Sequence, residues 1–212
     1  MSHKKYKIKY YFFYLSLICV LVFILQLNQY ISDLFVLNKA ALYNREYWRY
    51  VTAIFAHGNL SHLFYNLFAL LFFGYSLERL IGSKRFLIVF FASGIIANIL
   101  SVNYYDSSLG ASGAIYGVMG CLTAINPFML VFAFGFIMPM FLATIIWTIG
   151  DILGLFIPSN TGHIAHISGV AVGLFMGFLI RLLRKDKYRK ITEYKIKIPE
   201  SYMRKWEDVY IK

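Results

Sequence analysis

Long apolar runs that are almost free of charge are the feature that most constrains how this chain can fold. A helix needs about 20 apolar residues to cross a hydrocarbon core of about 30 Å, and the chain is 59% hydrophobic but only 15% charged. The sequence therefore predicts an all-α, polytopic membrane protein, a bundle of six transmembrane helices in one domain over 1–183. The six predicted spans are about 10–27, 60–80, 86–100, 112–125, 136–156 and 163–183.

Basic residues outside these runs predict the orientation of the chain. All but three of the 21 Lys and Arg residues lie before the first run, around the short loop between the second and third runs (79–85), or from Arg181 onward. Basic flanks stay preferentially in the cytoplasm, so we expect both termini to be cytoplasmic. The net charge of +11 therefore indicates basic membrane flanks and not a nucleic-acid-binding surface. The basic tail, 184–212, is predicted to contact anionic lipid or to remain solvated.

Two segments near the N-terminus leave a choice of interpretation. The first run has a basic flank, as a signal peptide has, but no small-residue cleavage site follows it, which favours a retained helix. The first outer loop, about 28–58, is rich in aromatic residues that prefer the membrane interface. We expect it to form short interfacial helices. Cys19 and Cys121 lie in apolar runs and do not indicate a disulfide framework.

Four polar residues in the predicted spans need a reason, because polar groups are costly in lipid. His62 and Asn66 lie four residues apart and so share one helix face. Ser112 lies in the first turn of its span, and His166 lies one turn into the last span. All three spans enter from the outside, so these groups are expected at a similar depth.

Small residues indicate that two of these spans pack closely. Gly113 and Gly117 are four residues apart, as are Gly169 and Gly173, and small residues at that spacing let helix backbones approach in lipid. A close crossing of the fourth and sixth spans would bring the Ser112 hydroxyl to the His166 imidazole. A serine hydroxyl needs such a base to become a nucleophile.

Each residue also has a simpler interpretation when it is taken alone. Ser112 could cap its helix, His166 could be a packing residue, and His62 and Asn66 could bond to each other or to backbone carbonyls. His163, one turn before His166, is the rival candidate for the base. The single clear intramembrane acid, Asp151, is interpreted as an interface residue near the outer end of its helix. The combination of the four polar groups favours a catalytic site.

The same residues resemble the rhomboid family of intramembrane serine proteases. The resemblance covers about 46–177, and only the region 126–158 matches poorly. It is carried by Glu46-Tyr47-Trp48-Arg49, by His57 with the His62/Asn66 pair, by Gly110-Ala111-Ser112-Gly113 with Tyr116, and by Ala165-His166 with Gly169 and Gly173.

The resemblance implies a rhomboid-like six-helix bundle and a role for each matching residue. Ser112 resembles the nucleophile and His166 the general base, in a dyad without an aspartate, while Tyr116 resembles the tyrosine that orients the base. His62, Asn66 and the Ser112 backbone N–H resemble the oxyanion hole. The residues with an implied structural role are Trp48, Arg49, His57, Gly110, Gly113, Gly169 and Gly173.

The expected activity is hydrolysis of peptide bonds in single-pass transmembrane substrates, near the outer face of the membrane. The chemistry calls for no metal and no organic cofactor, and the sequence leaves the substrate and the oligomeric state open. Two other functions remain possible. A catalytically dead relative would bind membrane clients without cutting them, and a transporter would line a pathway with the same polar groups.

Overall fold

The structure is a computed structural model that describes residues 8–159, 161–192 and 200. The chain divides into two compact units, Met1–Leu179 and Ile180–Lys212, and the first holds all the elements discussed below except the end of the last helix. Of the predicted tail at 184–212, only residue 200 and the helical backbone of 184–192 are described. The rest of the tail lies outside the described residues.

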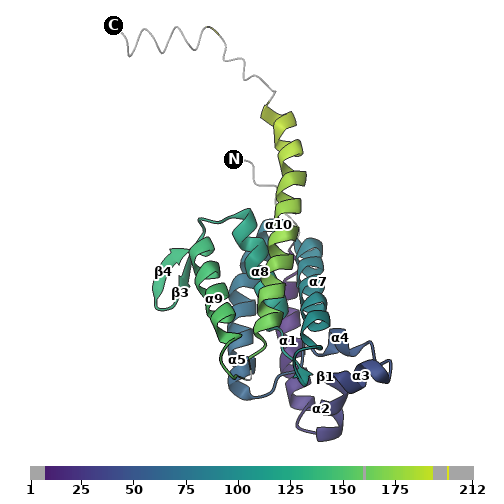
Figure 1. Cartoon of the computed structure of the whole chain (residues 1–212). Helices are drawn as coiled ribbons and strands as arrows, with labels where there is room; N and C mark the ends of the chain where they lie inside the picture. Colours follow the sequence, from purple (N-terminus) through teal and green to yellow (C-terminus); the bar gives the residue numbers. More distant parts are fainter. Residues whose placement is uncertain (1–7, 160, 193–199, 201–212) are drawn as a thin grey trace. The chain divides into compact units, whose positions relative to one another are not determined.

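The first unit is built mainly from apolar helices, several of which stand side by side in Figure 1. Each predicted span coincides with one helix or with a continuous helical segment. These are α1 (Tyr11–Leu25), α5 (Leu60–Ala69) continued by η1 (Leu70–Gly74) and α6 (Tyr75–Ile81), α7 (Ser83–Ser101), α8 (Ser112–Ile125), α9 (Met140–Gly154) and α10 (His163–Thr192).

Helix length separates these elements into two groups. Among the described residues, Leu60–Ile81, Ser83–Ser101 and His163–Leu183 are long and apolar enough to cross a membrane. The helices α1, α8 and α9 are apolar but shorter, and 15 residues rise only about 22 Å. The mostly helical membrane architecture is therefore established, whereas the count of six crossings stays a prediction.

The segment 28–58 folds into short helices, as the sequence predicts. They are α2 (Gln29–Phe35), α3 (Lys39–Tyr43) and α4 (Arg49–Thr52). The buried guanidinium of Arg49 donates to the carbonyl oxygens of Asp33 and Val36 and pairs with Glu46 at 2.6 Å. Arg49 thus ties α4 to the end of α2, while Trp48 is half exposed.

The prediction of an all-α fold needs a correction at two places. Strand β1 (Leu37–Asn38) pairs with β2 (Ser107–Ser108), and β3 (Leu130–Ala133) forms an antiparallel hairpin with β4 (Phe136–Pro139). The hairpin occupies the link between α8 and α9, and α9 consequently begins at Met140 rather than near Phe136.

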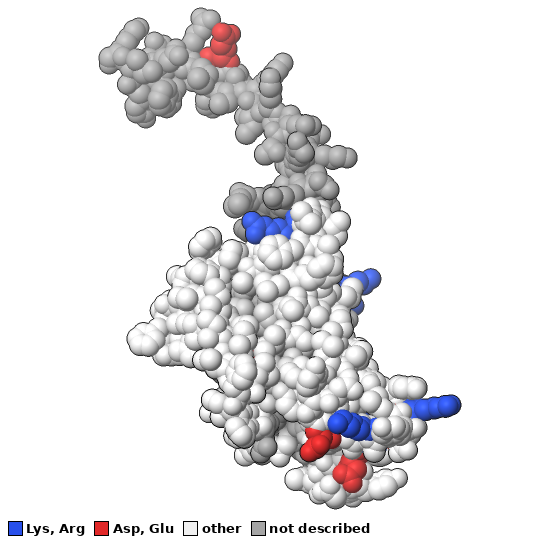
Figure 2. All heavy atoms as spheres, in the orientation of Figure 1, with Lys and Arg blue, Asp and Glu red and all other residues white. Residues whose placement is uncertain are grey.

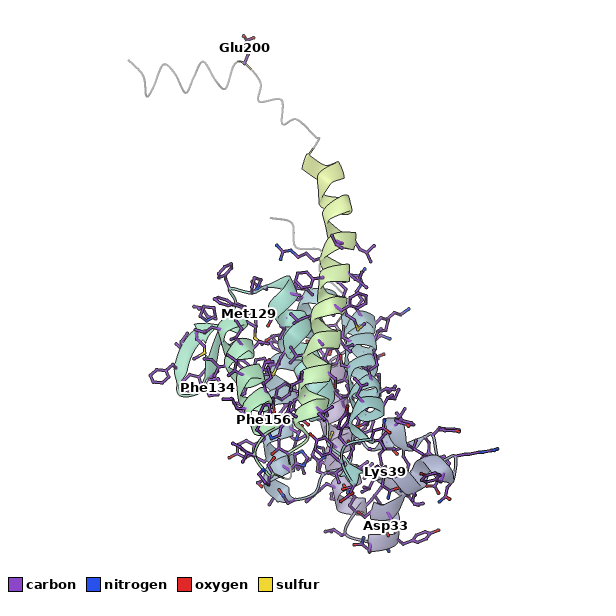
Figure 3. All side chains as sticks on the ribbon, viewed as in Figure 1. Asp33, Lys39, Met129, Phe134, Phe156 and Glu200 are labelled. Atoms are coloured by element: carbon purple, nitrogen blue, oxygen red, sulfur yellow. The ribbon has the colours of Figure 1, made fainter. Side chains whose placement is uncertain are left out.

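Turn chemistry explains the hairpin. Phe134 and Gly135 form the two-residue loop, and both have positive φ, 53° and 83°, as a type I′ turn requires. The Phe134 ring lies 4.8 Å from the Trp147 ring, centroid to centroid, so the hairpin lies along the first two turns of α9. Figure 3 labels Phe134 and Met129 on this part of the chain.

Charged side chains avoid the middle of the first unit. Figure 2 shows a broad uncharged band across this face, with charged side chains below it on the segment that contains α2 and α3. Many large apolar side chains are exposed around the helices, among them Leu21, Phe64 and Leu153. A surface of this kind is stable in lipid and not in water, which fits an integral membrane protein.

Glycines bring α8 and α10 into backbone contact. A Cβ atom built on Gly169 would lie 2.2 Å from the Gly113 carbonyl oxygen, and one on Gly173 would lie 1.9 Å from the Gly117 carbonyl oxygen. No other residue type allows this distance, since backbone atoms cannot move aside as a flexible side chain can. The close crossing expected from the glycine spacing is present.

Candidate active site

The first residues of α8 and α10 bring a hydroxyl and an imidazole together. Ser112 begins α8, and His166 lies one turn into α10. Nε2 of His166 lies 2.9 Å from Oγ of Ser112, and the His166 side chain is largely buried. This contact joins residues 54 positions apart in the chain, and it follows directly from the glycine-mediated crossing of the two helices.

An aromatic ring fixes the plane of the imidazole. Tyr116, one turn after Ser112, stacks on His166 with ring centroids 4.2 Å apart and ring planes within 8°. Stacked rings of this kind restrict rotation of the imidazole about its side-chain bonds. The residue that the resemblance assigns to orienting the base is therefore in contact with it.

Asp151 corrects two expectations from the sequence. Its side chain is buried and its Oδ1 lies 2.9 Å from Nδ1 of His166 and 2.7 Å from Nδ1 of His163. Asp151 is thus not an interface residue, and the imidazole is not without a carboxylate. The signal was an acid in an otherwise uncharged run, but its partner depends on the path of the loop between α9 and α10.

The contacts define the tautomer of both histidines. A carboxylate oxygen can only accept hydrogen bonds, so each Nδ1 carries a proton and donates it to Asp151. Nε2 of His166 is then left as the acceptor for the Ser112 hydroxyl. In the same way, Nε2 of His163 accepts from the Ser159 hydroxyl at 2.9 Å. Both ring nitrogens of His163 are therefore bonded to residues other than Ser112, which favours His166 as the base.

A cavity of about 1340 Å³ opens beside Ser112 and His166. His62 and Asn66 line it from α5, so all four polar residues singled out in the sequence reach one space. The Asn66 amide donates to the His62 carbonyl oxygen at 2.8 Å. An amide nitrogen has two N–H groups, so this bond leaves a second donor.

His57 and Gly110 support His62 from two sides. The rings of His57 and His62 meet edge to face at 5.1 Å, and a Cβ atom on Gly110 would lie 2.7 Å from the His62 ring. Nδ1 of buried His57 lies 3.0 Å from the Phe55 carbonyl oxygen. Burial, and to a smaller extent the neighbouring His62 ring, lowers the pKa of His57 from 6.5 to about 4.

Asp151, His163 and His166 are also the described residues that could together hold a metal ion. Their ligand atoms all lie within 4.8 Å of one another. One carboxylate oxygen already accepts from both imidazoles, so the present geometry is that of a hydrogen-bonded chain. The expectation that the protein needs no metal stays a prediction.

A hydroxyl, an imidazole and a carboxylate joined in this order have the arrangement of a serine hydrolase triad. Residues 44–183 match the rhomboid domain family. YdcA of Bacillus subtilis, named for the same family, is 35% identical over 151 residues, which cover 68% of this chain and 73% of YdcA. The rhomboid protease GlpG of Haemophilus influenzae is 28% identical over 180 residues, which cover 81% of this chain and 91% of GlpG.

The chain therefore belongs to the rhomboid family. This membership confirms the predicted family and the predicted enzyme class, a serine protease that is an integral membrane protein.

Proposed function

We propose that the chain is an intramembrane serine endopeptidase that hydrolyses transmembrane substrates with Ser112 and His166. The observation that carries the proposal is the 2.9 Å contact between Oγ of Ser112 and Nε2 of His166 at the wall of a cavity of about 1340 Å³. Nucleophile and base in hydrogen-bond contact are the signature of covalent serine catalysis.

The reaction proceeds by acyl transfer. His166 takes the hydroxyl proton as Ser112 attacks the scissile carbonyl, and the same proton passes to the leaving amine when the peptide bond breaks. Water then enters the cavity, loses a proton to His166 and hydrolyses the ester on Ser112. The alignment of the base is supported by the stacked Tyr116 ring.

The negative oxygen of the tetrahedral intermediate needs preorganised donors. The first N–H groups of a helix lack intrahelical partners, so the backbone N–H of Ser112 at the start of α8 is one donor. The free N–H of the Asn66 amide and the His62 ring supply the others from α5. The helix dipole of α8 adds partial positive charge at the same point.

Single-pass transmembrane proteins are the proposed substrates. The cavity continues from Ser112 to a group of apolar residues on α5, on the hairpin and on α9, among them Phe68, Phe134 and Trp147. A transmembrane segment entering there must unwind near its outer end, because a helical amide is hydrogen-bonded and shielded. Substrates with helix-weakening residues at that point are expected to be cut fastest.

The proposed topology has six crossings in one domain over 1–183, with both termini in the cytoplasm and the site near the outer face. The charge distribution supports it by the positive-inside bias, and 28–58 forms the outer interfacial loop. The basic tail, 184–212, is proposed to contact anionic lipid. The reaction requires no organic cofactor and no nucleic acid partner.

The proposal is tested by incubating the purified protein in proteoliposomes with a panel of single-pass transmembrane substrates. Wild type is expected to cut at least one substrate near its outer end, and Ser112→Ala and His166→Ala are expected to cut none. Cleavage that survives both changes would remove the assignment. Binding without cleavage by the wild type would instead indicate a non-catalytic relative.

A further inference from the structure

We infer that Asp151 is a positioning residue for the general base, so that the site works as a serine–histidine–aspartate chain whose third member comes from α9. The inference rests on the proposed function and extends it. In the dyad that the sequence suggested, the imidazole would have no carboxylate, whereas here the carboxylate touches the nitrogen opposite to the one facing Ser112.

Geometry is the first support. Oδ1 of Asp151, the His166 ring and Oγ of Ser112 form a continuous chain with links of 2.9 Å and 2.9 Å. The carboxylate holds the proton on Nδ1 and leaves Nε2 free to accept, which is the tautomer that proton removal from Ser112 requires. When His166 takes that proton, the adjacent negative charge stabilises the imidazolium.

Burial is the second support. Asp151 is only 5% exposed, so its charge acts on His166 with little screening by solvent. A buried carboxylate in a membrane protein is costly unless it has partners. The two imidazole donors supply them, and Oδ2 has no hydrogen-bond partner among the described residues. The carboxylate therefore interacts with buried or partly buried groups, the two histidines and the neighbouring Tyr116 side chain, and not with a surface network.

His163 is the second partner of Asp151 and weakens the hydrogen bond between Asp151 and His166. It donates to the same oxygen at 2.7 Å and is held in turn by the Ser159 hydroxyl at 2.9 Å. Because one oxygen serves two donors, the carboxylate is shared between His163 and His166. Loss of the His163 ring would remove one of the two imidazole donors and so strengthen the hydrogen bond between Asp151 and the base.

The arrangement also links the base to the wall of the cavity. Asp151 lies on α9, and Trp147, one turn earlier on the same helix, lines the cavity. A movement of α9 away from α10 would break the contact with Nδ1 of His166. The orientation of the base is thus coupled to the position of α9.

The test compares Asp151→Asn with Gly150→Ala, a neighbouring change on α9 at a position where an added Cβ meets no atom within 4 Å. Asn has nearly the same shape as Asp but no charge. We therefore expect kcat to fall about 10- to 1,000-fold, with KM changed less than about threefold. In triad proteases the matching change lowers kcat about 10⁴-fold. Gly150→Ala is expected to keep wild-type kcat.

The pH profile provides the readout that a purely structural role would not change. The titratable groups around His166 are Asp151 on α9, His163 on α10, Tyr116 on α8 and His62 on α5. Without the carboxylate, protonated His166 is less stable, so the acid limb of kcat/KM is expected to move to lower pH by about one unit or more in Asp151→Asn. In His163→Gln it is expected to move to higher pH.

Folding of Asp151→Asn is judged by its melting temperature and its elution as a single species. If this variant does not fold, the pH profile of His163→Gln tests the inference in its place. The inference is overturned if folded Asp151→Asn keeps kcat within about threefold and its acid limb does not move. It is also overturned if His163→Gln leaves the limb in place when Asp151→Asn does not fold. Activity that persists in Ser112→Ala would contradict the proposed function itself, and so the two failures are distinguishable.

Discussion

At the scale of single residues, the protonation state of a buried side chain affects the stability of the folded protein. His57 is the clearest case, because it packs on His62 but does not itself line the cavity. Its Nε2 is buried without a hydrogen-bond partner among the described residues. A second proton there would be a buried charge, so the folded protein keeps His57 neutral, in agreement with its lowered pKa.

The stability of the protein is therefore expected to fall as the pH drops from about 6.5 to about 4. In that window the unfolded chain protonates His57 and the folded chain does not, so protons favour unfolding, by up to about 3 kcal/mol. Thermal unfolding in detergent micelles between pH 7 and pH 4 measures the effect. His57→Gln is expected to show a smaller loss of melting temperature over this range, and an equal loss would refute the assignment.

The sequence was informative for residues whose position follows from helix periodicity. Ser112 and His166 stood out because polar groups are rare in lipid-facing runs, and glycine spacing predicted that their helices cross closely. Asp151 was visible by the same criterion, but its partners were not. Its contact with His166 depends on where the loop after α9 returns the chain, which no local pattern encodes.

Between elements, the crossing of α8 and α10 holds the site together. The contacts of Gly169 and Gly173 with α8 are made to backbone oxygens, which cannot move without moving the helix. The distance between Ser112 and His166 therefore depends on these glycines, although neither glycine touches a reacting group.

Gly173→Ala is expected to separate α8 and α10, because the new methyl group would overlap the Gly117 carbonyl oxygen. Overpacking of this kind costs about 1–3 kcal/mol, and we expect activity to fall at least tenfold. Melting temperature and cleavage rate measure the two effects. Gly150→Ala, where the added Cβ has open space, is the control, and equal behaviour of both variants would contradict the packing account.

The hairpin between α8 and α9 shows where sequence patterns were insufficient. The mostly apolar and uncharged stretch over 128–149 fits buried strands as well as a helix, and periodicity alone does not distinguish them. The deciding feature is the two-residue turn at Phe134 and Gly135, whose positive φ angles allow the chain to reverse between β3 and β4. The sequence interpretation accordingly began the fifth span too early.

Phe134→Asn tests whether the hairpin takes part in substrate binding. Asn tolerates positive φ, so the turn is kept while the ring that lines the cavity beside Trp147 is lost. We expect KM for a transmembrane substrate to rise about three- to tenfold, with unchanged labelling of Ser112 by a small fluorophosphonate. Phe136→Ala is the control, since Phe136 is not among the described cavity-lining residues. A KM unchanged in Phe134→Asn would remove the hairpin from substrate binding.

For the whole molecule, the topology sets the side of the membrane on which substrates are cut. Both native cysteines are buried, so a newly introduced cysteine can be labelled against a low background. Tyr43, in the segment between α1 and α5, and Lys84, in the first turn of α7, are both exposed. They lie on opposite sides of the membrane in the proposed orientation.

A membrane-impermeant maleimide is expected to label Tyr43→Cys in intact cells, and Lys84→Cys only after permeabilisation. The expectation follows from the distribution of Lys and Arg between the flanks. The opposite pattern would invert the proposed topology and place the cavity on the cytoplasmic side.

The central claim is that the Ser112 oxygen is an activated nucleophile because His166 accepts its proton. It is tested most directly by treating the protein in lipid with a fluorophosphonate and locating the adduct by peptide mass spectrometry. The account predicts one adduct, on Ser112, formed at least 100-fold more slowly in His166→Ala and absent in Ser112→Ala. An unlabelled Ser112 in active wild-type protein, or equal labelling in His166→Ala, would contradict it.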